Sequence, residues 1–236
     1  MPRSLAIIVP YRDRESHIRE LMPELASYLG RRHPGLAYRI WVIEQARGKH
    51  FNVGTIRNVG FALARAEEAH EQVCFHDVDY VPIDVDYGPV DGPTRLIWHG
   101  LRHVESREHF FSAVVAFPSV DFERVNGYPN AYWSWGSEDR EIRLRCRVAG
   151  LAIRHRDGTF RPLPHPHEGY GGGGDRDARA IQMRALLKAR MPGLRAGTVQ
   201  REDGLTSLRF REIRRRRVAI GSVPQAPFLW HVVVEI

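Results

Sequence analysis

The chain has 236 residues, of which 43% are hydrophobic and 27% charged, so it is long enough and apolar enough to bury one sizeable core. Its formal net charge is +7, but nearly all the positive charge is arginine, and residues 214–217 form its dense cluster. No nucleic-acid motif accompanies this charge, so a nucleic-acid partner is not expected. Contact of the cluster with an anionic membrane or a polyanionic glycan is the alternative.

No apolar stretch approaches the roughly 20 residues that a bilayer crossing needs. The N-terminal apolar run, which ends at Pro10, is too short for the core of a signal peptide, so it is predicted to be a strand. We therefore expect a cytoplasmic protein. Cys74 and Cys146 lie in unrelated apolar segments and are predicted to be buried free thiols.

Residues 4–75 have the pattern of alternating strands and helices. Apolar runs predict strands at 4–10, 38–44 and 72–75, and helical spacing of apolar residues predicts helices at 15–29 and 55–69. Because the order is β-α-β-α-β with short connections, we predict an α/β fold. Its Rossmann-like, mostly parallel sheet is expected to be flanked by helices.

The second half of the chain is less regular. Strands are predicted at 110–117 and 230–236, and helices at 119–125, 137–149 and 175–189. Ser119 and Ser137 are expected to cap the first two of these helices, and Gly150 to end the second. Residues 157–177 are rich in Gly, Pro and His and are predicted to form an irregular, mobile C-terminal lid loop.

Asp77 and Asp79 follow the short strand at 72–75, with Val78 between them. This position is the carboxyl edge of a parallel sheet, where open α/β sheets bind ligands. In an extended chain both carboxylates face the same way and can hold one hard cation, which can bridge to a diphosphate. The pattern alone is weak, because a solvated turn is the commoner explanation. The same letters recur at residues 84–86, in a predicted loop, and are assigned no role.

The segment 132–139, YWSWGSED, places Trp133 and Trp135 before Gly136 and the carboxylates Glu138 and Asp139. Indole faces suit the apolar face of a sugar ring, and a carboxylate there can accept the proton of an attacking hydroxyl. Core tryptophans, and carboxylates at the positive end of a helix dipole, explain the same residues. From the residues alone both explanations stay open.

His165 and His167 lie within the glycine-rich stretch. Two imidazoles at this spacing can reach one metal ion, and ligands on a mobile loop would couple closure of the loop to ligand binding. A surface His-Pro-His turn is the alternative and by itself the commoner one.

Together these segments resemble the β-1,4-galactosyltransferase family (glycosyltransferase family 7), and most closely its xylosylprotein branch. The similar segments follow the family's order over nearly the whole chain, and their co-occurrence is far more specific than any one of them. Residues 7–14 are similar to VPFRxR, 51–61 to FNRAxxxNVGF, 75–82 to DVDLxP, 126–139 to NGFPNxYWGWGGED, 165–167 to the HxH of the xylosylprotein branch, and 203–208 to DGLNSL.

The resemblance implies one domain of GT-A type over 1–236, with a nucleotide-sugar half at 1–100 and an acceptor and lid half at 101–236. It implies inverting, metal-dependent transfer of a hexose, first of all galactose from UDP-galactose, to a hydroxyl of a glycan acceptor in β-1,4 linkage. UDP-GalNAc or another UDP-hexose as donor, and an inactive sugar-binding module, are the alternatives. Manganese is the expected ion, with magnesium as the alternative.

The family's disulfide cysteines and Golgi anchor have no counterpart here, which favours a bacterial protein in the cytoplasm or peripheral to the inner membrane. A sugar nucleotidyltransferase is disfavoured, because residues 10–14 lack the glycines of its phosphate loop.

Roles for single residues follow from the same resemblance. It implies that Asp79, His165 and His167 hold the metal. It also implies that Asp139 is the base for the acceptor hydroxyl and that Glu138 holds the acceptor or the sugar. It further implies that Trp135 moves with the lid. The residues expected along the donor are Pro10, Arg12, Arg14, Phe51, Asp77, Val78, Trp135 and Gly136.

Several positions depart from the family pattern. Val53 stands where FNR has its arginine, which removes one expected donor contact. Arg140 replaces a third carboxylate after WGWGGED, so acceptor recognition is expected to differ. Ser112-Ala113 replaces two glycines below the donor sugar, and Phe110 replaces a tyrosine that helps to distinguish galactose from N-acetylgalactosamine.

Overall fold

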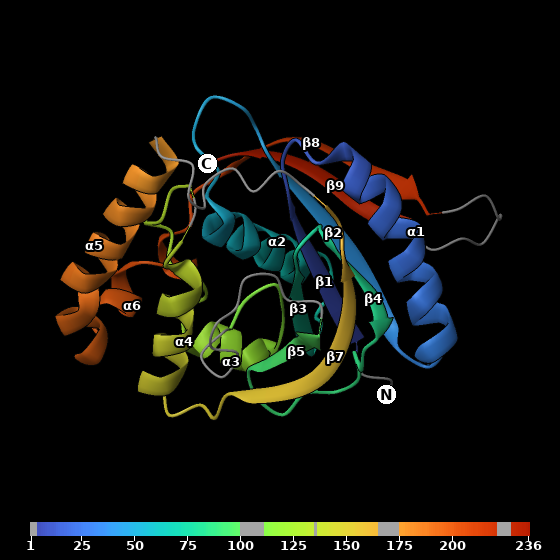
Figure 1. The fold of residues 1–236 in the computed structure, drawn as a ribbon, viewed down its shortest axis with the longest axis horizontal. Helices are drawn as coiled ribbons and strands as arrows, with labels where there is room; N and C mark the ends of the chain where they lie inside the picture. The colour runs from blue at the N-terminus through green and yellow to red at the C-terminus, as the bar shows by residue number, and fades with distance from the viewer. Residues whose placement is uncertain (1–3, 100–110, 135, 165–174, 221–227) are drawn as a thin grey trace.

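The computed structural model describes residues 4–99, 111–134, 136–164, 175–220 and 228–236. In this part of the chain, nine strands form one sheet in the order β4-β7-β5-β6-β3-β1-β2-β9-β8 (Figure 1). The strands are β1 (Ser4–Tyr11), β2 (Ala37–Gln45), β3 (Gln72–His76), β4 (Tyr80–Asp84), β5 (Thr94–His99), β6 (Val114–Pro118), β7 (Arg154–Pro162), β8 (Arg211–Ala219) and β9 (Phe228–Glu235). The helices are α1 (Glu15–Arg32), α2 (Val53–Glu67), α3 (Ser119–Arg124), α4 (Glu138–Val148), α5 (Asp175–Arg195) and α6 (Val199–Glu202), with a 3-10 turn, η2, at Leu205–Ser207.

The centre of the sheet is parallel, as predicted. Strand β1 pairs in parallel with β2 and β3, and β2 with β9. Towards the two ends of the sheet the pairing is mainly antiparallel: β6 with β3, β5 with β6, β4 with β7, and β8 with β9. The α/β fold is therefore confirmed, as a mixed sheet in which β1 and β3 end at the same edge.

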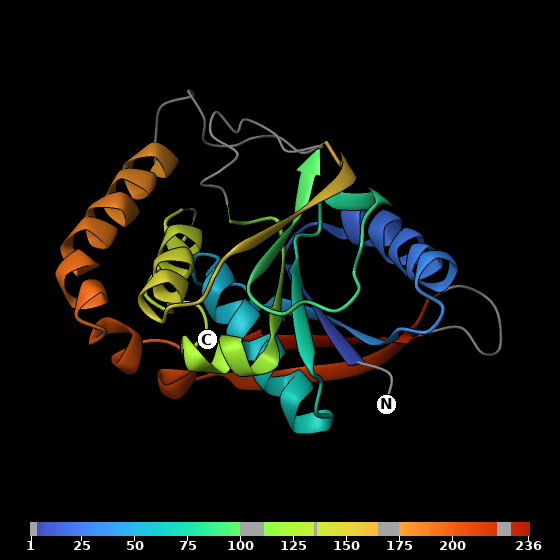
Figure 2. The ribbon, with the colours of Figure 1, turned by 90° about the horizontal axis from the view of Figure 1, so that it is seen from below.

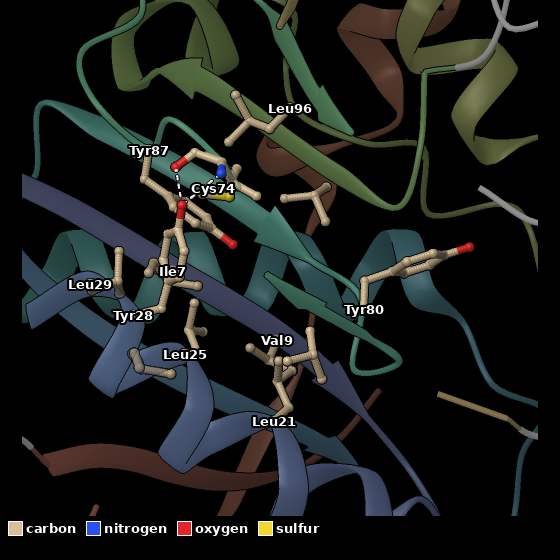
Figure 3. Packing of buried hydrophobic residues seen from close by; sticks show 14 of the residues in the cluster. Ile7, Val9, Leu21, Leu25, Tyr28, Leu29, Cys74, Tyr80, Tyr87 and Leu96 are labelled. Carbon is tan, nitrogen blue, oxygen red and sulfur yellow. Dashed lines mark hydrogen bonds between the residues drawn. The ribbon is translucent and has the colours of Figure 1, made fainter. Parts of the chain in front are cut away.

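Strand β1 has a core on each of its faces. Ile7 and Val9 pack against α1, including Leu25, on one face (Figure 3). On the other face Ile8 packs with residues of α2. A Cβ on Gly60 of α2 would lie 2.3 Å from Cγ2 of Ile8, so glycine is required for the helix to lie this close to the sheet.

Two predicted segments differ from the structure. The strand predicted at 110–117 begins at Val114. Residues 157–162 are not irregular, because they belong to β7. In β7 a Cβ on Gly158 would lie 1.9 Å from the carbonyl oxygen of Leu96, so this glycine lets β7 approach β5. Strands β4, β5 and β8 are additional to the prediction. Asp84, which was expected in a loop, is the last residue of β4, and the arginine cluster at 214–217 lies in β8.

The predicted helix caps are partly wrong. Pro118 is the N-cap residue of α3, and the Ser119 hydroxyl instead donates to the carbonyl of His70 at 2.6 Å. Ser137 does hold the N-cap position of α4, but its side chain makes no capping hydrogen bond. Cys74 and Cys146 are buried free thiols, as predicted. Within the described ranges no helix combines the length and apolarity needed to cross a membrane.

Candidate functional site

The segment Asp77–Asp79 forms a turn at the carboxyl end of β3 rather than the extended chain that was expected. The backbone of the turn is fixed at both ends: Asp77 N donates to Ala113 O at 2.8 Å, and Leu163 N donates to Asp79 O at 2.7 Å. Val78 is buried, whereas Asp77 and Asp79 are partly exposed. Both carboxylates are therefore accessible to a ligand at the carboxyl edge of the sheet.

His76, just before this turn, serves the scaffold. Its ring nitrogens lie 2.9 Å from the carbonyl oxygen of Asp77 and 3.0 Å from the hydroxyl of Tyr87. Burial lowers the pKa of His76 to about 4, so the ring is neutral near pH 7. A neutral, fully hydrogen-bonded ring suits a residue that orients the turn.

The carboxylates of Glu138 and Asp139 lie in the first turn of α4, where the helix dipole favours negative charge. The preceding backbone is left-handed at Ser134 (φ 73°) and Ser137 (φ 80°), and such strain at non-glycine residues clusters at functional sites. Glu138 is 5% exposed, and its Oε2 has no hydrogen-bond partner among the described residues. Burial, and next the charge of Asp139, raise the pKa of Glu138 to about 8.

Arg57 of α2 connects the turn after β3 to the start of α4. Its Nη2 lies 2.7 Å from Asp77 Oδ1, and its Nη1 lies 3.0 Å from Asp139 Oδ1. The side chain is 3% exposed, and the guanidinium lies 4.8 Å from the centre of the Tyr128 ring. The predicted diphosphate-binding turn and the predicted base therefore lie within reach of one cation. The sequence prediction missed Arg57, although a charged residue beside the apolar positions of a predicted helix is a detectable sign.

Two asparagines, Asn52 and Asn58, connect the sequence motifs at 51–61 and 126–139. The Asn58 side chain accepts a hydrogen bond from Tyr128 N at 2.9 Å and donates to Tyr128 O at 2.8 Å. The Asn52 side chain donates to Asn130 O at 2.7 Å. Helix α2 thus fixes the loop at 126–130, and this loop in turn places Tyr128 against Arg57.

A buried ionic network, also missed from the sequence, holds α4 in place. Glu141 is 0% exposed and accepts hydrogen bonds from Tyr132, Arg145 and Arg190 at 2.7, 2.7 and 2.8 Å. Burial raises the pKa of Glu141, but the bonds from Arg190 and the charge of Arg145 outweigh it and lower the pKa below its usual value. Arg190 of α5 also binds Asp203 at 2.6 Å, so α4, α5 and residue 203 form one unit. Helices α4 and α5 lie on the opposite side of the molecule from α1 (Figures 1 and 2).

The residues expected along the nucleotide are brought together in part. Pro10 is buried at the end of β1. The Arg12 side chain donates to the carbonyl of Lys49 at 2.7 Å and lies 5.1 Å from the centre of the Phe51 ring. Phe51 O accepts a hydrogen bond from Ser134 N at 2.7 Å, which links this group to the segment that contains Gly136. Arg14 is the N-cap residue of α1.

Only part of the predicted set of metal ligands is among the described residues. Asp79 is described, whereas His165, His167 and Trp135 lie outside the described residues. Among the residues that are described, no three His, Cys, Asp or Glu side chains are grouped as a metal site. Asp77 and Asp79 do fit a divalent cation: burial raises the pKa of Asp77 to about 6, Arg57 opposes this, and Asp79 and Asp139 add to it. A cation would relieve that crowding of oxygen donors, which are ligands that Mg²⁺ and Mn²⁺ accept.

Solved structures share this architecture. The catalytic domain of Drosophila β-1,4-galactosyltransferase 7 in complex with xylobiose matches with a TM-score of 0.78 and 23% identity, over 99% of this chain and 94% of that one. A mutant of the same protein in complex with manganese, UDP-Gal and xylobiose matches with a TM-score of 0.78, 22% identity and the same coverage. The fold, with a carboxylate turn at the end of β3, is therefore that of a GT-A type glycosyltransferase domain.

Family models identify the branch of this class. One, the N-terminal region of glycosyl transferase group 7, matches residues 1–87, and another, the N-terminal domain of galactosyltransferase, matches residues 101–168. Together they include more than half of the sequence. The chain belongs to glycosyltransferase family 7, the family of the β-1,4-galactosyltransferases.

Sequence relatives agree with this assignment. β-1,4-Galactosyltransferase 4 of Homo sapiens is 38% identical over 68% of this chain and 45% of its own. β-1,4-Galactosyltransferase 5 of Danio rerio is 31% identical over 90% and 54%, respectively. β-1,4-Galactosyltransferase 7 of Drosophila melanogaster is 26% identical over 93% and 66%. The chain thus spans between about half and two thirds of the length of these curated relatives.

Proposed function

We propose that the chain transfers a hexose, specifically galactose from UDP-galactose, to a hydroxyl of a sugar acceptor, with inversion and in β-1,4 linkage. The observation that carries this proposal is the shared guanidinium: Asp77 and Asp139 lie 2.7 and 3.0 Å from the nitrogens of Arg57. One site thereby joins a turn suited to a metal–diphosphate and a carboxylate suited to a base. The manganese, UDP-Gal and xylobiose bound by the Drosophila protein support the same assignment for this chain.

In the proposed reaction Asp139 accepts the proton of the acceptor hydroxyl as its oxygen attacks the anomeric carbon. The new C–O bond forms as the bond from that carbon to the diphosphate breaks, and UDP leaves with the electron pair. Attack opposite the leaving group inverts the configuration, so no covalent enzyme intermediate is needed. Asp79, with His165 and His167 as the resemblance implies, would hold Mn²⁺, which supplies positive charge to the leaving diphosphate.

Glu138 has a different proposed role from Asp139. Because its pKa is raised to about 8, its carboxyl is largely protonated near pH 7 and can donate a hydrogen bond to a sugar oxygen. Its Oε2 is buried and has no hydrogen-bond partner among the described residues, so a sugar oxygen would satisfy it. The two adjacent carboxyl groups can therefore have different roles, with Glu138 binding the sugar and Asp139 accepting the proton.

The direct test is a screen of UDP-galactose, UDP-GalNAc and other UDP-hexoses with xylosides and other sugar acceptors, in manganese and in EDTA. We expect transfer from UDP-galactose that requires the metal. Binding of UDP-sugars without turnover would support an inactive binding module, and no binding in manganese would refute both.

Location and surface contacts are further proposals. We propose a bacterial, cytoplasmic protein that touches an anionic membrane or polyanionic glycan through the arginines at 214–217 of β8, of which Arg214, Arg216 and Arg217 are exposed and Arg215 is partly buried. Part of that charge is compensated, since Arg215 pairs with Glu212 at 2.7 Å. Sedimentation with phosphatidylglycerol vesicles, compared with phosphatidylcholine vesicles, tests the contact.

A further inference from the structure

Arg57 is an unusual residue for the interior of a helix that packs on a sheet. Its neighbours along α2, Ile56 and Val59, are core residues, and its own side chain is 3% exposed. A buried guanidinium is costly unless its hydrogen bonds are satisfied and its charge is compensated. Two carboxylates, those of Asp77 and Asp139, compensate the charge of Arg57, and neither residue lies on its helix.

The geometry of the guanidinium sets the distance between the two carboxylates. Its two terminal nitrogens are held in one rigid plane, so an aspartate on each of them has a defined place relative to the other. The Tyr128 ring, whose centre lies 4.8 Å away, limits the positions of that plane. Arg57 therefore fixes the position of Asp139, on the acceptor side, relative to Asp77, on the donor side, although it lies on neither segment.

The third nitrogen of the guanidinium, Nε, is unused among the described residues. Arg57 Nε is buried and has no hydrogen-bond partner among the described residues, and the same holds for Glu138 Oε2. A purely structural arginine would be expected to satisfy all its donors within the protein. An unused buried N–H donor and an unused buried carboxyl oxygen in one site are typical of a place that a polar ligand completes.

The sequence supplies a second, independent observation. Val53 stands where the family pattern FNR has an arginine, and Arg57 comes four residues later on the same helix. Residues four apart lie on one face of a helix, about 5–6 Å apart at Cβ. The positive charge missing at one position is thus present one turn further along the same face.

We propose that Arg57 is a positioning residue, which holds Asp139 in line with the turn at 77–79. The proposal rests on the proposed transfer reaction. It concerns the placement of the base, so its loss affects turnover more than donor binding.

The test compares Arg57→Leu, Arg57→Lys and the double variant Val53→Arg/Arg57→Leu. Arg65→Leu is the matched control, since Arg65 is on the same helix but 45% exposed. For each protein, thermal unfolding, UDP binding in manganese by calorimetry, and kcat and KM for the acceptor are measured. Transfer by the wild type is established first, so that failure of the reaction itself is distinguished from failure of this inference.

We expect Arg57→Leu to lower kcat about 100-fold, the lower end of what a positioned base contributes, while UDP affinity changes by less than about tenfold. Added guanidinium chloride at millimolar concentration and the double variant should each restore part of kcat. Arg65→Leu should leave kcat unchanged.

A kcat for Arg57→Leu within a few-fold of the wild type would overturn the proposal. So would a loss that neither guanidinium nor the double variant restores. If Arg57→Leu does not fold, Arg57→Lys decides: it keeps the charge but loses the rigid fork, so kcat should fall at least about tenfold in a folded protein. An unchanged kcat for a folded Arg57→Lys would refute the inference.

Discussion

The tripeptide Asp-Val-Asp occurs at 77–79 and again at 84–86, and the structure gives its two copies different surroundings. In the first copy Asp77 pairs with Arg57, whose side chain is 3% exposed, at the carboxyl edge of the sheet. In the second copy Asp84 pairs with Arg32, and the two side chains are 72% and 60% exposed. Identical letters therefore acquire chemistry from their place in the topology, because only the first copy ends a central parallel strand.

Neutralising one aspartate in each copy should give the largest contrast. Asp79→Asn is expected to lower kcat at least about 100-fold, because several kcal/mol of charge stabilisation at the leaving diphosphate depend on the metal ligand. Asp86→Asn is the control, since Asp86 pairs with Arg156 and is 61% exposed. Its kcat should stay within about twofold, as expected for an exposed pair. Equal losses in initial-rate assays would mean that the two copies do not differ in function.

Stability should separate the buried network of α4, the helix that begins with the site carboxylates, from the surface pairs of the second copy. Glu141→Gln removes the fully buried carboxylate that pairs with Arg145 and Arg190, leaves Asp203 as their remaining counter-charge, and should cost about 3 kcal/mol of unfolding free energy. Asp84→Asn removes an exposed pair and should cost less than about 1 kcal/mol. Urea unfolding measures both, and similar costs for the two variants would contradict the structure.

The crowded carboxylates should also make stability depend on pH. Burial and Asp139 raise the pKa of Glu138 from 4.5 to about 8, so the folded metal-free protein keeps a proton that the unfolded chain releases. The contribution of this proton to the free energy of unfolding is complete below about pH 4.5. It is lost as the pH rises from there through about 8, by up to about 1.4 kcal/mol per pH unit. Unfolding free energies in EDTA should therefore fall with pH more steeply in the wild type than in Glu138→Gln. Parallel curves would show that Glu138 ionises normally.

The smallest effect concerns the support of the first copy. Ala113, whose carbonyl accepts the hydrogen bond of Asp77 N, has a φ of 67°, where the family pattern has glycine. A left-handed alanine is strained by about 1 kcal/mol, so Ala113→Gly should stabilise the protein by about that amount. A lower melting temperature for Ala113→Gly would be the opposite result.

These contrasts also mark how far the sequence predicts the structure. Long apolar patterns predict β1, β2, α1 and α2 well, because burial on both faces of a sheet leaves continuous apolar runs. Strand β7 (RHRDGTFRP) is not predicted by such a pattern, since its side chains are mostly polar and its Gly158 is needed for the close approach of the backbone to β5. Strand β8 (REIRRRRVA) lies at an end of the sheet, where charged residues on a strand give no alternating pattern.

For the site, motifs locate Asp77, Asp79, Glu138 and Asp139, but not the residues between them. Arg57 occupies a position that the family pattern leaves open, and its two partners are 20 and 82 residues away in the chain. Such long-range contacts depend on how α2, β3 and α4 meet in space. A single sequence shows that a charge is present, but not which carboxylates it joins.

The turn at 77–79 and Asp139 are proposed to form one site, in which the turn serves the donor and Asp139 accepts the proton of the acceptor. Measuring UDP–manganese affinity and galactose transfer for Asp139→Asn on the same preparation tests it most directly. We expect donor affinity within a few-fold of the wild type and transfer reduced by about 10²–10⁴-fold, the contribution of a general base. Transfer by Asp139→Asn at the wild-type rate would contradict it.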